Sequence, residues 1–337
     1  MKKVLKTQGF NLGQMHHFAH LEWNNNGYIP DEIITQIKSL VAPELLEVCR
    51  MSGTMSNHWA ADLPGYNHNS HTIQINNRRQ NTQPTESYLY AFIDFYKKMG
   101  FKELVWTVNT ISPWMYPNER QLWENRMWAM LDELDKQGIK ISVICMENEM
   151  WMYPQCVVMP NGNLPFAQKL IYSPLNALRN DTWWANNIIK PRMRDFLAYL
   201  DVIAYKIKKR YPNIKIALST DNNTHMRGRL LTEVIQEFRF YDIICPHIYI
   251  KATNKTDLEN QVRQRLNHAK VYGREIWVTE FNWDYGANDS GQAQGAYHDN
   301  FFKTDMLQAL DKFGAHAGFF HTLWSGRSSY GFVPMVS

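Results

Sequence analysis

Two glutamates stand where strand-like segments of the sequence end, and paired carboxylates of this kind can break a covalent bond. Glu149 lies in the segment IKISVICMENEMW, residues 139–151, whose first half is apolar and rich in β-branched residues. Glu280 follows a similar run in WVTEFNW, residues 277–283. Charged side chains are seldom buried unless they are paired or functional. One carboxyl group of such a pair can donate a proton while the other attacks as a nucleophile.

Other polar or aromatic residues end further strand-like segments. In parallel α/β folds, ligands bind at the carboxyl ends of the strands, so these side chains are expected to share one site. The candidates beside the two glutamates are Arg50, Asn109, Asn148, Asp221, His247, Tyr249 and Trp324.

Strand-like and helix-like segments, which must position these residues, alternate along the whole chain. Strands are predicted at 10–15, 45–51, 104–109, in the apolar first half of 139–151, and at 214–220, 241–249, 275–280 and 316–324, with helical periodicity between most of them. This order predicts the α/β class and one (β/α)8 barrel, the TIM barrel, as a single domain over residues 1–337. Only 13 residues follow Trp324, so the eighth helix is expected to be short or absent. Long loops are predicted at about 52–84 and 152–182, on the face that carries the site.

Composition excludes several classes of function. The net charge of +4 is too small to indicate nucleic acid binding, and no segment has the length of a membrane span. Cys49, Cys145 and Cys245 lie in apolar runs, which favours buried free thiols over disulfides. Trp114 and Trp283 belong to the many aromatic residues in polar segments, where flat rings suit the C–H faces of sugars. The oligomeric state cannot be predicted.

Taken in order, these residues resemble the clan A glycoside hydrolases, a superfamily that includes cellulases, mannanases and agarases. The resemblance runs from the first predicted strand to the eighth. It rests on Arg50 ending strand two, the Asn148–Glu149 pair ending strand four, His247-Ile248-Tyr249 on strand six, Glu280 ending strand seven and Trp324 closing strand eight.

The resemblance implies a retaining hydrolase of a β-linked poly- or oligosaccharide, without a cofactor or metal. Glu149 would be the acid/base and Glu280 the nucleophile, in contact with Tyr249. Asn148 would bind the sugar 2-hydroxyl and Trp324 would stack on the sugar beside the cleaved bond. The long loops favour an endo-acting enzyme. Such a substrate suggests a secreted or periplasmic protein, although no signal peptide is visible and the localisation stays unknown.

Three alternatives remain open. Glu147 precedes the Asn-Glu pair and is a second candidate for the acid/base, and strand alternation would put Glu147 and Glu149 on the same side. A non-catalytic carbohydrate-binding barrel would use the same aromatic residues. A metal-dependent hydrolase barrel would instead draw on histidines, here His16, His17, His20, His247 and His321.

Overall fold

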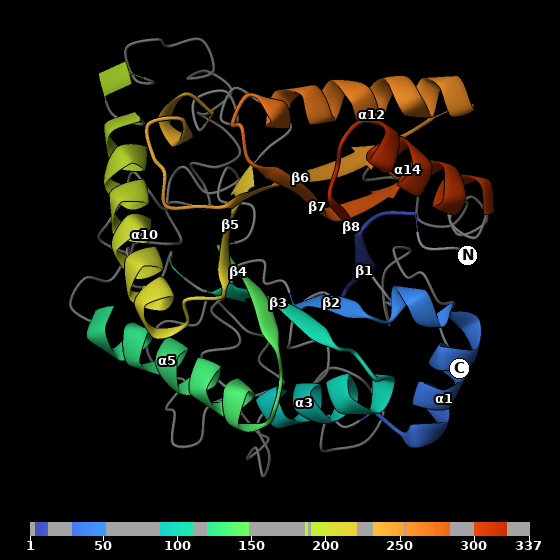
Figure 1. Cartoon of the computed structure of the whole chain (residues 1–337), viewed down its shortest axis with the longest axis horizontal. Coiled ribbons are helices and arrows are strands. Elements are labelled where there is room, and N and C mark those ends of the chain that lie inside the picture. Colours follow the sequence, from blue (N-terminus) through green and yellow to red (C-terminus); the bar gives the residue numbers. More distant parts are fainter. Residues whose placement is uncertain are drawn as a thin grey trace, which may run out of the picture.

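The chain folds around a closed barrel of parallel strands. The computed structural model describes residues 4–12, 29–51, 88–108, 110, 120–147, 186–187, 190–220, 232–252, 254–283 and 300–321. Within these ranges eight strands pair in chain order, and the last pairs with the first (Figure 1). All these pairings are parallel. The predicted (β/α)8 barrel is therefore confirmed.

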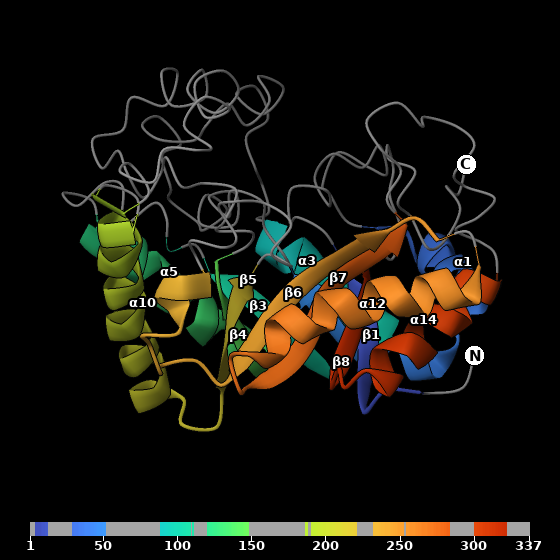
Figure 2. The ribbon, with the colours of Figure 1, turned by 90° about the horizontal axis from the view of Figure 1, so that it is seen from above.

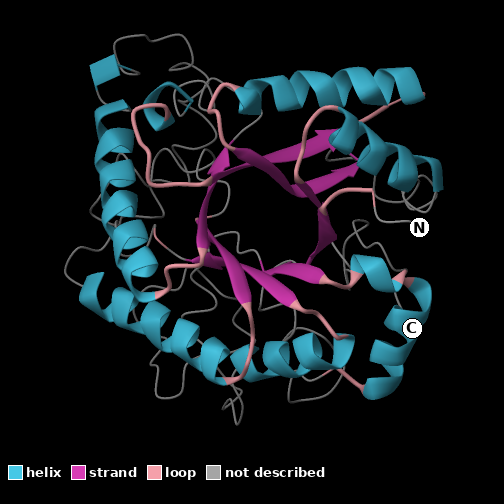
Figure 3. Cartoon of the chain, in the orientation of Figure 1, coloured by secondary structure: helices cyan, strands magenta, loops and turns pink. Residues whose placement is uncertain are grey.

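The strands alternate with helices that surround the barrel (Figure 3). The strands are β1 (Thr7–Asn11), β2 (Val48–Met51), β3 (Glu103–Val108), β4 (Ile141–Met146), β5 (Lys215–Thr220), β6 (Ile243–Ile250), β7 (Glu275–Trp283) and β8 (Ala317–His321). The helices include α1 (Asp31–Leu40), the 3-10 helix η2 (Pro43–Leu45), α3 (Tyr88–Met99), α5 (Arg120–Lys136), α10 (Lys190–Arg210), α12 (Lys255–Lys270) and α14 (Asn300–Lys312). In the view from above, α12 lies against α14 and β6 (Figure 2).

Local sequence explains where the helices pack and end. One stripe of α10 is buried, at intervals of three and four residues that keep it on one side of a helix. Asn254 is the N-cap of helix α12, and its side-chain oxygen accepts the backbone N–H of Asp257 at 2.9 Å. Gly138 and Gly273 follow α5 and α12 with φ of 76° and 60°, a conformation that glycine adopts without strain. None of the described helices combines the length and apolar character needed to cross a membrane.

Two apolar cores stabilise the barrel, one between strands and helices and one inside the ring of strands. Inside the ring, Trp277 and Phe319 stack with centroids 6.1 Å apart. The backbone of β2 lies directly against Gly9 of β1. A Cβ atom at this position would lie 1.9 Å from the carbonyl oxygen of Val48. The inner core gives way to polar residues toward the carboxyl ends of the strands, where Asn11, Arg50 and Glu280 are buried.

The first strand lies earlier in the sequence than predicted. It spans Thr7–Asn11 instead of residues 10–15. The side-chain oxygen of Gln8 accepts the backbone N–H groups of Val4 and Leu5 at 3.0 and 3.2 Å, so a polar residue is buried where the sequence shows no apolar alternation. Strand β7 is also longer than predicted and continues to Trp283. The two long loops and the segment after β8, where a short or absent eighth helix was expected, lie outside the described residues.

Candidate active site

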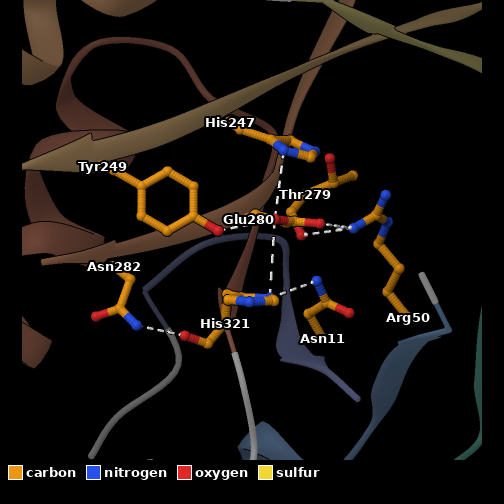
Figure 4. Close-up of polar contacts among 8 residues, drawn as sticks. All are labelled: Asn11, Arg50, His247, Tyr249, Thr279, Glu280, Asn282 and His321. Carbon is orange, nitrogen blue, oxygen red and sulfur yellow. Dashed lines mark hydrogen bonds and ion pairs between the residues drawn. The ribbon is translucent and has the colours of Figure 1, made fainter. Parts of the chain in front are cut away.

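Glu280 of β7 is a buried carboxylate held by groups from two other strands (Figure 4). The side chain of Glu280 is 5% exposed. Arg50 donates from Nη1 to its Oε1 at 2.8 Å, and the hydroxyl of Tyr249 donates to its Oε2 at 2.7 Å. His247 Nδ1 lies 3.3 Å from the same Oε2. Both carboxylate oxygens are thus fixed, and the contact between Tyr249 and Glu280 that the resemblance implied is present.

An extra residue in β7 turns Glu280 toward the interior of the barrel. Glu280 comes four residues after Ile276, whereas their partners on β6 are residues 247 and 244, three apart. The pairing of β7 with β8 is irregular at the same place, between Val278 and Phe281. Both of these side chains pack in the outer core, so the inserted residue leaves Glu280 pointing inward between them. Bulges of this kind often redirect a side chain beside an active site.

Arg50 reaches Glu280 across the barrel. Strands β2 and β7 are separated by β1 and β8, and the Arg50 side chain is fully buried. Its Nη1 also lies 3.5 Å from the backbone oxygen of Thr279. Burial alone would lower the pKa of the Arg50 guanidinium. The interactions of this group, of which that with the Glu280 carboxylate is the largest, raise this pKa by more than burial lowers it, so the net shift is upward. Arg50 is therefore a permanent cation beside Glu280.

The same surroundings keep Glu280 ionised. Burial raises the pKa of Glu280, but the charges of His247, His321 and Arg50 lower it more, and the pKa stays below its ordinary value. A buried carboxylate that remains ionised near neutral pH can act as a nucleophile or a base. It is not suited to donate a proton.

Two thiols lie deeper in the barrel, next to Arg50. Cys145 of β4 and Cys245 of β6 are buried and free, as their apolar surroundings in the sequence predicted. A hydrogen bond with Cys245 lowers the pKa of Cys145 to about 7; burial opposes this shift, and the charges of Arg50 and His247 support it. Burial and the neighbouring Cys145 raise the pKa of Cys245. The sulfur atoms of Cys145 and Cys245 are thus polarisable neighbours of the Arg50 guanidinium.

His321 at the end of β8 also belongs to the site. Its Nδ1 lies 3.7 Å from Oε2 of Glu280 and 2.9 Å from Nδ2 of Asn11, its pairing partner on β1. Asn282 donates from its side chain to the backbone oxygen of His321. Sequence reasoning considered His321 only as a metal ligand, and it missed Asn11 because the first strand was predicted too late. Correct placement of β1 would have put Asn11 at a strand end.

Glu147 is buried at the end of β4 and connects this end with the neighbouring strand. Its carboxylate accepts the backbone N–H of Thr110 at 2.9 Å, and its own N–H donates to the backbone oxygen of Val108 at 3.2 Å. Its φ of 69° lies in the left-handed region, which is strained for a residue with a Cβ. Regular strand alternation therefore ends at Glu147. Alternation no longer supports the prediction that Glu147 and Glu149 lie on the same side.

One of the remaining candidates lies in a described strand. Trp283 is the last residue of β7. The others lie outside the described residues: Asn109, Trp114, Asn148, Glu149, Asp221, Trp324, His16, His17 and His20. Among the described residues, no group of three or more His, Cys, Asp or Glu side chains is arranged to hold a metal ion.

The barrel resembles solved structures of glycoside hydrolases, whereas no protein-family model and no curated protein matches the sequence. An endo-β-1,4-mannanase from Thermotoga petrophila is 11% identical, with a TM-score of 0.53 over 95% of this chain and 68% of that chain. A family 51 α-L-arabinofuranosidase from Bifidobacterium longum is 12% identical, with a TM-score of 0.54 over 99% and 70% of the two chains. A GH5-4 broad-specificity endoglucanase from an uncultured bacterium is 12% identical, with a TM-score of 0.52 over 96% and 90%.

At these identities the likeness shows a common fold. The chain shares the (β/α)8 barrel fold with these enzymes. What the site does chemically has to be argued from its own residues.

Proposed function

We propose that this protein is a glycoside hydrolase that cleaves β-glycosidic bonds of a poly- or oligosaccharide with retention of configuration. The observation that carries the proposal is Glu280, a buried and ionised carboxylate at the carboxyl end of a barrel strand, held by Arg50 and Tyr249. Active sites of such barrels lie at this end of the strands.

Glu280 is the proposed nucleophile. Attack on an anomeric carbon requires an ionised carboxylate in one orientation, and the contacts to both of its oxygens supply this. A bond forms between Glu280 and the anomeric carbon while the bond to the leaving oxygen breaks. Water then displaces Glu280 and releases the sugar with its original configuration.

Glu149 is the proposed acid/base. It donates a proton to the leaving oxygen in the first step and takes one from the attacking water in the second. Its support is its place in the sequence, directly after Asn148 at the end of the fourth strand, and the likeness of the fold to glycoside hydrolases. Retention requires its carboxyl group to lie about 5–5.5 Å from that of Glu280.

Sugar binding is proposed for the polar and aromatic residues around this pair. In the described region these are Arg50, His247 and Tyr249, the side chains next to Glu280. From the sequence they include Asn109, Trp114, Asn148, Trp283 and Trp324. The long segments after β2 and β4 favour action within a chain over action at its end. The glycosidases of similar fold include enzymes named for mannan and galactan, so β-linked plant polysaccharides are the first substrates to test.

The test is a reducing-sugar assay over a panel of β-linked polysaccharides, with wild type beside Glu280→Gln and Glu149→Gln. Both variants should lose activity, by about 10²–10⁴-fold for the acid/base and at least as much for the nucleophile. Glu275→Gln is the matched control, because Glu275 lies on the same strand, more than a third exposed, in an ion pair with Lys215. Wild-type turnover by Glu280→Gln would overturn the proposal.

Two further measurements separate the details. Azide should restore turnover to Glu280→Ala and yield a glycosyl azide of opposite configuration to the substrate, which only a retaining enzyme with this nucleophile would give. Nuclear magnetic resonance of the first-formed sugar anomer tests retention directly. Binding of a glycan by wild type without any turnover would instead support the carbohydrate-binding barrel.

A further inference from the structure

Glu147 joins the ends of β3 and β4, two neighbouring strands of the barrel (Figure 1). It directly follows β4 and is fully buried. Its backbone N–H donates to the backbone oxygen of Val108, the last residue of β3, at 3.2 Å. Its Oε2 accepts the backbone N–H of Thr110 at 2.9 Å and the hydroxyl of Thr110 at 3.4 Å. One residue thus binds both sequence neighbours of Asn109.

The backbone of Glu147 has a conformation that glycine would adopt more easily. Its φ of 69° lies in the left-handed region, and among the described residues other than glycine it alone has a positive φ. The other described residues with positive φ are glycines that follow helices. Strain of this kind persists where surrounding contacts hold it, and it is concentrated at active sites. A glutamate in this place supplies what glycine cannot, a carboxylate that reaches the end of β3.

The two strand ends that Glu147 joins lead into candidate site residues. Asn109 comes directly before Thr110 in the sequence. Asn148 and Glu149 directly follow Glu147. These three candidates lie outside the described residues, and the sequence alone gives their order. Because the chain leaves β4 through the left-handed backbone of Glu147, this conformation sets the starting direction of the segment that carries Glu149.

The contacts of Glu147 favour a role other than proton transfer. An acid/base must reach the leaving oxygen of the substrate. Oε2 of Glu147 instead accepts two groups of Thr110, and the residue is 0% exposed. Of the two glutamates on either side of Asn148, Glu147 is therefore the one suited to hold the backbone.

We propose that Glu147 is a positioning residue, whose carboxylate binds the end of β3 and whose left-handed backbone fixes the direction in which Glu149 leaves β4. This inference rests on the proposed hydrolase function. It deepens that function by assigning the two neighbouring glutamates to different tasks. Without the carboxylate of Glu147, the proton donor is displaced from the leaving oxygen, and a displacement of about 1 Å can lower a rate about 10²-fold.

Substitutions of Glu147 separate positioning from proton transfer. Glutamine keeps an oxygen that accepts the Thr110 amide but cannot serve as an acid, so Glu147→Gln should keep kcat within about threefold of wild type. Glu147→Ala lacks the acceptor and should lose about 10²-fold in kcat, with little change in KM. A loss of about 10²–10⁴-fold in Glu147→Gln would make Glu147 itself the acid/base and overturn the proposal.

Glu147→Gly separates the carboxylate from the backbone strain. Glycine adopts a positive φ without strain, so this variant keeps the turn, loses the carboxylate and should lose as much turnover as Glu147→Ala. It also keeps the test decisive where the alanine variant does not fold. Wild-type kcat in Glu147→Gly would show that the carboxylate positions nothing, and it would overturn the proposal.

The leaving group of the substrate distinguishes positioning of the acid from a general structural role. A dinitrophenolate leaves with little help from a proton donor, whereas a sugar alkoxide needs that help. Glu147→Ala should therefore lose about 10²-fold in kcat/KM on the glycan but less than about tenfold on the dinitrophenyl glycoside of the same sugar. Equal losses on both substrates would overturn the proposal.

Glu124→Ala is the matched control for these measurements. Glu124 is also a buried glutamate, but it lies on α5 outside the ring of strands and accepts a bond from Lys206 of α10 at 2.6 Å. Its loss should leave the ratio of kcat/KM between the two substrates unchanged. A ratio that shifts as much in Glu124→Ala as in Glu147→Ala would overturn the proposal, because the effect would then not be specific to the end of β4.

The outcomes keep this inference apart from the proposed function. Absence of turnover on every glycan and aryl glycoside would refute the hydrolase and, with it, the role of Glu147. Turnover that is lost in Glu280→Gln and Glu149→Gln but stays at the wild-type level in Glu147→Ala would refute the positioning role alone.

Discussion

Breaking the ion pair between Arg50 and Glu280 should strongly destabilise the barrel. Its atoms are 2.8 Å apart and the two side chains are 0% and 5% exposed. At an effective dielectric constant near 20, two unit charges whose centres are ~4 Å apart attract by about 4 kcal/mol. Removing one partner leaves the other buried without its countercharge, which costs about 3–5 kcal/mol.

Arg50→Met is therefore expected to lower the free energy of unfolding by about 3–5 kcal/mol, since it removes the fully buried, permanent cation beside Glu280 and leaves the two neighbouring histidines. Glu280→Gln should cost a similar amount, because the buried Arg50 then lacks its anion. The double variant carries neither charge, so it should be at least about 3 kcal/mol more stable than the sum of the single losses predicts.

Urea denaturation measures these values. Far-UV circular dichroism and tryptophan fluorescence should give the same transition, and the slope with urea should match that of wild type. Arg194→Met is the control, because its pair with Glu237 is about half exposed and should contribute no more than about 1 kcal/mol. A loss below about 1 kcal/mol for Arg50→Met, or a double variant that loses the full sum, would refute the reasoning.

Three further results are expected. The pKa of Glu280 is lowered in the fold, so the ionised carboxylate stabilises the folded protein fully above pH 4.5, and this stabilisation is lost as the pH falls below that value. The melting temperatures of wild type and Glu280→Gln should therefore converge in acid. A constant difference between them would contradict this. Gly9→Ala should cost about 3 kcal/mol or more in urea unfolding, because the new Cβ would meet the backbone of Val48, and a wild-type midpoint would show that the strands can separate. Glu147→Ala should cost about 1–3 kcal/mol and speed hydrogen exchange of the Thr110 amide, whereas Glu147→Gln keeps an acceptor for that amide and should do neither.

The barrel could be predicted because its strands obey simple patterns. Seven of the eight strands overlap the predicted ranges closely, since buried parallel strands appear as short apolar runs between helical stretches. The exception is β1, where Thr7, Gln8 and Gly9 interrupt the apolar pattern. The buried side chain of Gln8 binds two backbone N–H groups, and such bonds cannot be seen in the sequence.

Three of the side chains that contact Glu280 were predicted from the sequence, whereas the irregularity of its strand was not. Arg50, His247 and Tyr249 were expected near Glu280, and all three contact it. The extra residue in β7 was not foreseen, because it shows only in the register of β7 against β6 and β8.

Two other features depend on pairing between distant strands. The left-handed turn at Glu147 forms where its carboxylate binds the end of β3, and His321 gains its place from Asn11 on β1. Such contacts follow from the register of the closed barrel. Residue types alone could name these side chains as candidates without assigning their partners.

Two of the contacts around Glu280 form only when the two halves of the barrel come together, so the activity of the site reports barrel closure. Arg50 and Glu280 are 230 residues apart, and Asn11 and His321 are 310 apart, so each pair joins the first half of the barrel to the second. Contacts between such distant segments form only after long loops have closed, which makes them slow to assemble. A fragment with β1–β4 or β5–β8 alone would hold half of each pair. Turnover regained during refolding, or on mixing the two fragments, would therefore time the final closure of the barrel.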